Sequence, residues 1–182
     1  TQSKTDLETS VSNTIASFTD NNLEDFNLPF RHSLVTGLID DVDNAITNNT
    51  TTVTMAKFFT PSLTTSSNYT VSFNNAFYNP HSGHNSSGGG VIASTGFQID
   101  GDTSTEYFFD EDGSGNLRTY SVVSGTRTYL NSTAGSVDYA NGIVTINALK
   151  ITAVSNVDGQ TSTTIRVTAI PSSNDIVPVR NQ

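Results

Sequence analysis

The side chains best suited to chemistry in this chain lie in an acidic, glycine-rich run from Asp110 to Asn116. Carboxylate oxygens at alternate positions, such as those of Asp110 and Asp112, can converge on a hard cation like Ca²⁺, and glycine lets the loop bend sharply. The twelfth position counted from Asp110 is Ser121, however, which cannot supply the bidentate carboxylate that closes such a loop. Acidic residues and glycines are also typical of a tight turn. We therefore expect a turn here and no calcium site.

Two histidines, His81 and His84, share a loop rich in glycine and serine. Imidazole is a common metal ligand, but a zinc site needs three or four ligands held in place. An ion shared between symmetry-related subunits is the one arrangement that would complete their coordination. The weak metal candidates are thus Asp110, Asp112, His81 and His84, and we predict neither a bound metal nor a cofactor.

Catalytic residue types are present without a catalytic pattern. His32 precedes Ser33, but no G-x-S-x-G elbow accompanies them. The three glycines at 88–90 lack the Gly-Lys-Ser/Thr that completes a phosphate-binding loop. An acid–base hydrolase using Glu106, Asp110 or Glu111 would rest on the availability of carboxylates alone. We predict that the chain is not an enzyme.

Composition narrows the class of protein further. The chain has 182 residues, enough for one domain or two small ones, with 34% hydrophobic residues and a net charge of −9. So acidic a chain is poorly suited to nucleic acid, whose phosphates are neutralised by Lys and Arg. Cysteine is absent, and no apolar run approaches the roughly 20 residues needed to cross a bilayer. We expect no nucleic-acid or membrane partner and find no signal peptide, while a start at Thr1 without Met suggests a fragment or a processed chain.

Two helices are predicted at the front of the chain. Apolar residues recur at helical spacing over 4–18, where Thr5 or Asp6 is a suitable N-cap. A second helix is predicted over 33–47, with Ser33 as its N-cap. Its apolar stripe is expected to be buried, and consists of Leu34, Val35, Leu38, Ile39, Val42 and Ile46.

The rest of the chain is predicted to be β structure. Closely spaced turn residues between apolar runs over 105–151 favour an antiparallel meander, and Asn141-Gly142 is typical of a two-residue hairpin turn with positive φ. Further strands are predicted over 51–59, 69–73, 91–99 and 163–170. The expected fold is α+β: a short N-terminal helical pair over 1–50 and a mostly antiparallel β domain, meander or sandwich-like, over 51–182.

The same stretches resemble a known family. The aromatic strand Tyr107-Phe108-Phe109, the acidic glycine turn, LRTY at 117–120 and YLNSTAGSVDYANGIVTI at 129–146 are similar to the late part of baseplate wedge proteins. These are the large ring-forming subunits of contractile phage tails, related to the baseplate J-like proteins. The segment 30–40 resembles their helical lead-in, and 170–182 their closing segment.

The resemblance implies a structural virion protein, located in the phage tail baseplate and assembled in the bacterial cytoplasm. Its partners would be copies of itself, most simply through dimer contacts, and other wedge proteins. The candidate interface residues are Tyr107, Phe108, Phe109, Leu38 and Val42. Three consecutive aromatic residues in a strand face both sides of a sheet, and one side then has to be covered by another element or another chain. The alternative is a β-rich ligand-binding or adhesive module, calcium-assisted and carbohydrate-binding.

Overall fold

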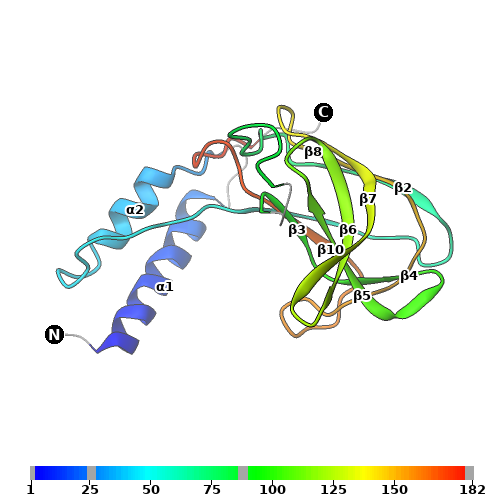
Figure 1. Cartoon of the computed structure of the whole chain (residues 1–182). Coiled ribbons are helices and arrows are strands. Elements are labelled where there is room, and N and C mark those ends of the chain that lie inside the picture. Colours follow the sequence, from blue (N-terminus) through cyan, green and yellow to red (C-terminus); the bar gives the residue numbers. More distant parts are fainter. Residues whose placement is uncertain (1–2, 24–27, 86–89, 179–182) are drawn as a thin grey trace. The chain divides into compact units, whose positions relative to one another are not determined.

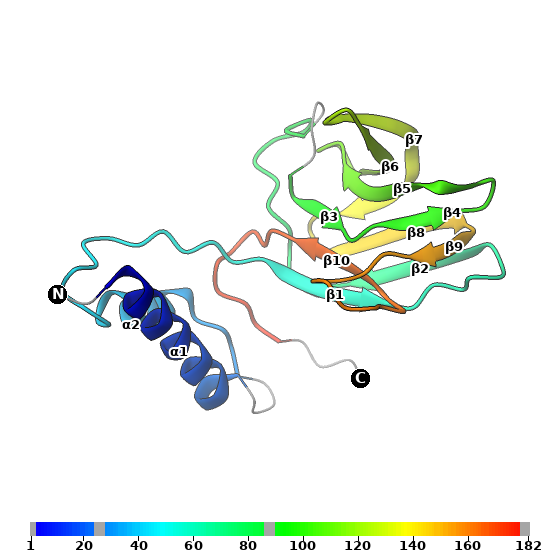
Figure 2. The ribbon, with the colours of Figure 1, turned by 90° about the horizontal axis from the view of Figure 1, so that it is seen from below.

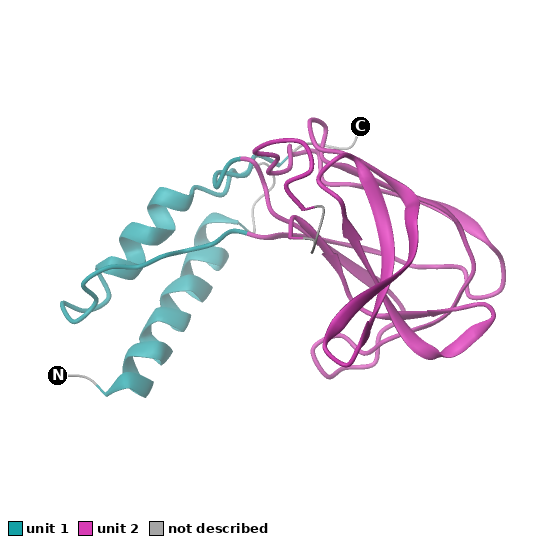
Figure 3. Cartoon of the chain, in the orientation of Figure 1, with its two compact units in different colours: residues 1–53, 173–182 teal, residues 54–172 magenta. Residues whose placement is uncertain are grey.

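The computed structural model describes residues 3–23, 28–85 and 90–178, and its chain divides into two compact units. One unit comprises residues 1–53 together with 173–182, and the other comprises residues 54–172 (Figure 3). We call them the helical unit and the β unit. The predicted features at Gly88, Gly89 and 179–182 lie outside the described residues.

The first helix, α1, spans Lys4–Asn22 and is longer than the predicted 4–18. Its N-cap is Ser3 rather than Thr5 or Asp6, because Ser3 and Asp6 form a capping box. The Ser3 Oγ accepts a hydrogen bond from the Asp6 backbone N–H at 3.2 Å, and the Asp6 carboxylate accepts one from the Ser3 N–H at 3.3 Å. The last turn persists beyond Phe18, where the Asn22 side chain donates to the Phe18 carbonyl oxygen at 3.1 Å.

The second helix, α2, spans only His32–Asp40, and the prediction of a helix reaching residue 47 was wrong. Arg31 is its N-cap, without a side-chain hydrogen bond, so Ser33 does not cap it. The predicted stripe is buried only in part. Val35 and Ile39 are buried as expected, whereas Leu34 and Leu38 are 45% and 37% exposed. The two pairs lie about 100° apart around the helix, so the buried face is narrower than the predicted stripe.

The helical unit has a small core. Its buried residues among those described are Phe18, Val35 and Ile39, and the partly buried residues packed on them are Val11, Leu23, Phe30 and Ile46. The rings of Phe18 and Phe30 meet edge to face at 6.0 Å between centroids. The closing segment belongs to this unit because the backbone of Phe30 pairs with that of Ile176 through hydrogen bonds of 2.9 and 3.0 Å.

The β unit consists of two antiparallel sheets (Figures 1 and 2). A three-stranded sheet has the order β1 (Met55–Phe59), β10 (Ile165–Ala169), β3 (Ile92–Ser94). A seven-stranded sheet has the order β2 (Ser67–Ser72), β8 (Ile143–Leu149), β7 (Thr126–Asp138), β6 (Asn116–Val123), β5 (Asp102–Glu111), β4 (Phe97–Ile99), β9 (Ile151–Val154). Both sheets contribute side chains to one hydrophobic core, which includes Val71, Phe97, Phe109, Ile146, Ile165 and Val167. The α+β fold and the antiparallel meander, β5 to β8, are thus confirmed.

The hairpin turns differ in detail from the prediction. Strands β7 and β8 are joined by a four-residue loop, because Asp138 pairs with Ile143. Gly142 has the predicted positive φ, 65°, but Asn141 does not, so the expected two-residue turn was wrong. Two-residue turns with positive φ at both positions occur instead at Ser124-Gly125, between β6 and β7, and at Asp158-Gly159, where Val157 pairs with Gln160.

The aromatic run lies inside β5 and faces both sides of the sheet, as expected. Tyr107 and Phe109 are 7% and 1% exposed and belong to the core, so these two candidate interface residues are covered within the chain. Phe108 points to the opposite face and is half-buried there, with its ring 5.6 Å from that of Tyr120. Among the described residues, no helix is long and apolar enough to span a membrane.

Candidate functional site

The first carboxylate of the acidic run, Asp110, belongs to strand β5 and not to the turn. It is 1% exposed and lies opposite Arg118 of the neighbouring strand β6. Its Oδ1 accepts a hydrogen bond from Arg118 Nε at 2.9 Å, and its Oδ2 accepts bonds from Arg127 Nη1 at 2.5 Å and the Tyr129 hydroxyl at 3.0 Å. Because both oxygens are engaged by charged or hydroxyl donors, Asp110 acts as a structural counter-ion on this sheet face.

The two arginines also stack on aromatic rings of the same face. The Arg118 guanidinium lies 4.3 Å from the centroid of the Tyr129 ring, and that of Arg127 lies 4.5 Å from the centroid of Tyr120. Burial, followed by the hydrogen bond to Asp110, raises the pKa of the Tyr129 hydroxyl. Burial likewise raises the pKa of Tyr120. These contacts join strands β5, β6 and β7 through one cluster of charged and aromatic side chains. The cluster covers this face of the sheet with few purely apolar side chains.

The second carboxylate, Glu111, is fully buried on the opposite face. It accepts hydrogen bonds from the Asn85 side chain, the backbone N–H of Gly113, the Val91 N–H at 3.3 Å and the Tyr139 hydroxyl at 2.6 Å. Burial and this bond to Glu111 together raise the pKa of Tyr139. Glu111 therefore ties the loop that precedes β3 to the loop between β7 and β8.

The third carboxylate, Asp112, forms the turn that the sequence predicts. Its Oδ1 accepts from the backbone N–H groups of Ser114 at 2.7 Å and Asn116 at 3.0 Å, while its Oδ2 accepts from the Asn116 side chain at 2.6 Å. Partial burial opposes ionisation of Asp112, but the Asn116 and backbone hydrogen bonds outweigh it and lower the pKa. These oxygens are already engaged by the turn itself.

The remaining catalytic or ligand candidates are dispersed. His81 Nδ1 lies 3.1 Å from the Ser82 carbonyl oxygen, and His84 Nδ1 lies 2.9 Å from that of His81. His32 Nε2 lies 2.9 Å from the Thr51 carbonyl oxygen, and Glu106 accepts a hydrogen bond from the Ser155 hydroxyl. Over the described ranges, no group of three or more His, Asp or Glu side chains is placed to hold a metal ion.

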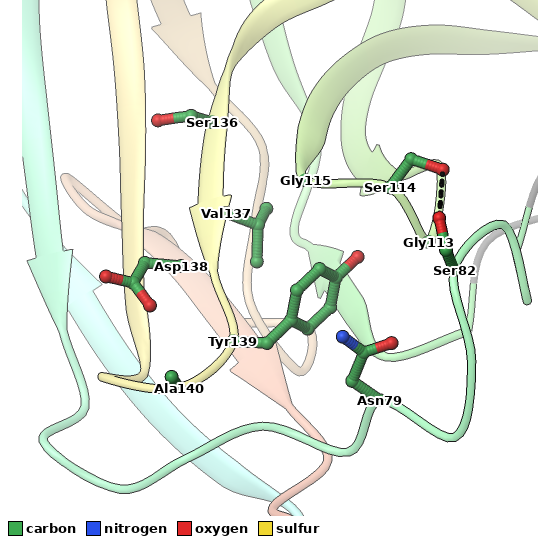
Figure 4. Close-up of a pocket in the computed structure, with 10 residues that line it drawn as sticks. All are labelled: Asn79, Ser82, Gly113, Ser114, Gly115, Ser136, Val137, Asp138, Tyr139 and Ala140. Atoms are coloured by element: carbon green, nitrogen blue, oxygen red, sulfur yellow. Dashed lines mark hydrogen bonds between the residues drawn. The ribbon is translucent and has the colours of Figure 1, made fainter.

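An open groove of about 530 Å³ lies next to the hydrogen bonds of Glu111 and Asp112, at one end of the β unit. Three stretches that are far apart in the sequence line it: 79–82, 113–115 and 136–140. Figure 4 shows the Tyr139 ring beside the Asn79 amide, while Ser136 and Asp138 project from the other side of the same strand end. Asp138 is oriented by Asn141, whose backbone N–H and side chain donate to it at 3.0 and 2.7 Å.

The helical unit offers a different kind of surface. Leu34 and Leu38 lie one turn apart on α2, and both are exposed. Leu38 also borders a groove of about 390 Å³ whose other lining residues belong to α1. Ile15 of α1 is exposed as well. Val42, the other interface candidate of this unit, follows the end of α2 and is half-buried.

Sequence reasoning missed the partners of the carboxylates, chiefly Arg118, Arg127 and Tyr139. Each of the two arginines lies two residues before a tyrosine, so that Arg and Tyr share one face of a strand. Only eight residues of the chain are Lys or Arg, and two of them fall in this apolar meander. That placement is a signal that could have pointed to a buried ion pair.

The chain has an α+β fold with a helical pair and a two-sheet β unit. Residues 1–58 match the family model of the baseplate structural protein gp6, C-terminal domain III. The match includes both helices and most of strand β1. It supports a structural role in a phage tail baseplate, and hence a location in the virion. No curated protein matches the chain.

Proposed function

We propose that this chain is part of a baseplate wedge subunit, which builds the ring around the hub of a contractile phage tail through subunit contacts. The single observation that carries this proposal is the match of residues 1–58 to a structural baseplate family. The matched stretch contains both helices. The apolar side chains of Leu34 and Leu38, on α2, are exposed. The proposed work of the protein is assembly, with contacts that rearrange on tail contraction and no bond chemistry.

Within that role, we assign the helical unit to contacts with other chains. Its core has only three buried residues among those described, and one side of α2 leaves two leucines one turn apart in solvent. Burying a leucine side chain stabilises a contact by roughly 1.5–3 kcal/mol. A partner that covers Leu34 and Leu38 therefore supplies burial that this unit lacks. The proposed partners are copies of this chain and other wedge proteins.

Light scattering on the purified chain across micromolar concentrations tests self-association. We expect a mass that rises to a dimer or a larger assembly, and a return to monomer when Leu34→Asp and Leu38→Asp are combined. The control is Leu63→Asp, which changes an equally exposed leucine of the β unit and should leave the mass unchanged. A monomer at every concentration would contradict self-association.

The baseplate role is tested in the phage that encodes the chain. Virions carrying the paired leucine substitutions should show incomplete baseplates by electron microscopy, whereas the Leu63→Asp control should assemble normally. Intact baseplates with the paired substitutions would show that the helical unit is not part of the assembly surface. Absence of the protein from purified virions would contradict the structural role itself.

A further inference from the structure

We propose that the groove at the end of the β unit binds a neutral oligosaccharide. The groove is built as binding sites on β scaffolds commonly are, from three loops or strand ends held by a rigid sheet. Hydrogen bonds hold the middle stretch, 113–115, to both others: Gly83 N–H, next to the first stretch, donates to the Gly113 carbonyl oxygen at 2.9 Å, and Val137 N–H donates to that of Gly115 at the same distance. The groove therefore exists before a ligand arrives. This inference is independent of the assembly role.

The aromatic residue among those that line the groove is Tyr139, whose ring is half-buried against the core. Its hydroxyl donates to the fully buried Glu111 at 2.6 Å, and the edge of the His84 ring packs nearby, 5.9 Å between centroids. The ring is thus held in one orientation and loses little conformational freedom on binding. A fixed aromatic plane suits the flat, C–H-bearing face of a sugar ring.

The polar groups that line the groove, with Asn79 beside the ring and Ser136 and Asp138 on the other side of the strand end, select the kind of ligand. The side chains of Asn79 and Ser136 have no hydrogen-bond partner among the described residues, so both are available to a ligand. Asn141 donates two hydrogen bonds that hold the pKa of Asp138 below its usual range, which keeps that carboxylate a charged acceptor. An amide, a hydroxyl and an oriented carboxylate match a ligand rich in hydroxyl groups.

The charge of the groove excludes two other ligand classes. No Lys or Arg is among its lining residues, and Asp138 carries a negative charge. Phosphorylated or acidic glycans would be repelled, because nothing here neutralises them. Asn79 lies beside the Tyr139 ring, whereas Ser136 and Asp138 project from the other side of the strand end (Figure 4). A ligand that reaches both sides has to pass over this end, which favours an extended oligosaccharide over a single sugar.

The test begins with the purified chain on an array of neutral and acidic glycans. We expect retention of neutral oligosaccharides and none of acidic ones. Titration of the strongest neutral binder, followed by amide chemical shifts, should move the signals of Asn79, Ser114 and Tyr139. Failure of every neutral glycan to bind, or binding confined to acidic glycans, would overturn the proposal.

Substitutions then locate the site. Tyr139→Ala should weaken binding about tenfold or more, and Asn79→Ala or Ser136→Ala by about threefold to tenfold, the loss of one hydrogen bond. Phe58→Ala is the matched control, since it removes an exposed aromatic ring of β1 that does not line the groove. Tyr139→Ala also removes a donor to Glu111, so a thermal melt accompanies it, and the other two variants test the site without touching that network. Unchanged affinity in both of these variants would place the sugar elsewhere.

Discussion

The two units of this chain reach stability by different means. Among the described residues, the β unit buries sixteen apolar residues in one cluster, whereas the helical unit buries three. The β unit adds two buried carboxylates that are each fully hydrogen-bonded, at Asp110 and Glu111. Among the described residues, the ion pair of the helical unit, Lys4 with Glu8 at 3.6 Å, is exposed. The β unit is thus stabilised by its own buried contacts, whereas the helical unit leaves apolar side chains of α2 exposed.

The two units should therefore respond differently to substitutions. Changes inside the β unit should lower its own stability, because its contacts are internal. Changes on the exposed side of α2 should affect association more than folding. The following experiments either strengthen this contrast or remove it, and they run from the largest expected effect to the smallest.

Removal of the Asp110 carboxylate should have the largest effect. Asp110→Ala deprives the buried Arg118 of its counter-ion, and breaking such a pair costs about 3–5 kcal/mol. The control is Asp100→Ala, because the exposed pair of Asp100 with Lys150 should contribute no more than about 1 kcal/mol. Urea unfolding of both variants measures the difference. Equal stabilities would mean that the buried cluster does not hold the three strands together.

The turn glycine of the meander should come next. Gly142 has a φ of 65°, and a Cβ on it would lie 1.9 Å from the Asn75 carbonyl oxygen. Gly142→Val should therefore destabilise the β unit by about 3 kcal/mol, combining backbone strain with a steric clash. Gly101→Val isolates the strain alone, since Gly101 has a φ of 87° and open space around it. Similar midpoints in chemical denaturation for the two variants would show that the clash is relieved.

The two sides of α2 should respond differently to truncation. Ile39→Ala removes a buried side chain and should cost about 2 kcal/mol or more, whereas Leu38→Ala should cost less than about 1 kcal/mol. Hydrogen exchange of the α1 and α2 amides, measured at a concentration where the chain is monomeric, reports the stability of the helical unit directly. Stronger loss of protection in Leu38→Ala than in Ile39→Ala would show that the side of α2 carrying Leu38 is the buried one.

Alkaline pH should weaken only the β unit, because all six tyrosines lie in it. Burial first, and hydrogen bonds to carboxylates second, raise the pKa of Tyr107, Tyr129 and Tyr139 in the folded state. These hydroxyls ionise more readily in the unfolded chain, so stability is retained below a pH of about 10 and lost above it. Thermal melts between pH 8 and about 11, with tyrosinate absorbance, follow both events. A melting temperature independent of pH over that range would contradict the raised pKa of these tyrosines in the folded state.

Calcium should have the smallest effect. The oxygens of Asp112 are engaged by the turn, and those of Asp110 by arginines and a tyrosine. Millimolar calcium, compared with chelator, should shift the melting temperature by less than about 1 °C, because a ligand that does not bind the folded state adds no stability. A rise of several degrees that Asp112→Asn abolishes would show a real calcium site.

Much of this architecture was predictable from local patterns. Alternating apolar residues on 165–169 and around Val71 indicate strands with one buried face, and such faces are confirmed. The acidic glycine turn was also foreseeable, because Asp112, Gly113 and Asn116 favour tight turns wherever they occur. The end of α2 was not foreseeable, since apolar residues continue to Ile46 although the helix stops at Asp40.

The sequence by itself determined the α+β class, the meander and the alternation of faces, because these depend on residues close together in the chain. It also indicated a structural baseplate protein, through a resemblance that the match of residues 1–58 supports. Only the tertiary structure decided which side of α2 is buried and which arginines neutralise Asp110, 8 and 17 residues away. It likewise brought Asn79, Ser114 and Tyr139 together in one groove. Such contacts depend on how strands are paired and how helices are rotated, and free energies of packing over the whole fold set both.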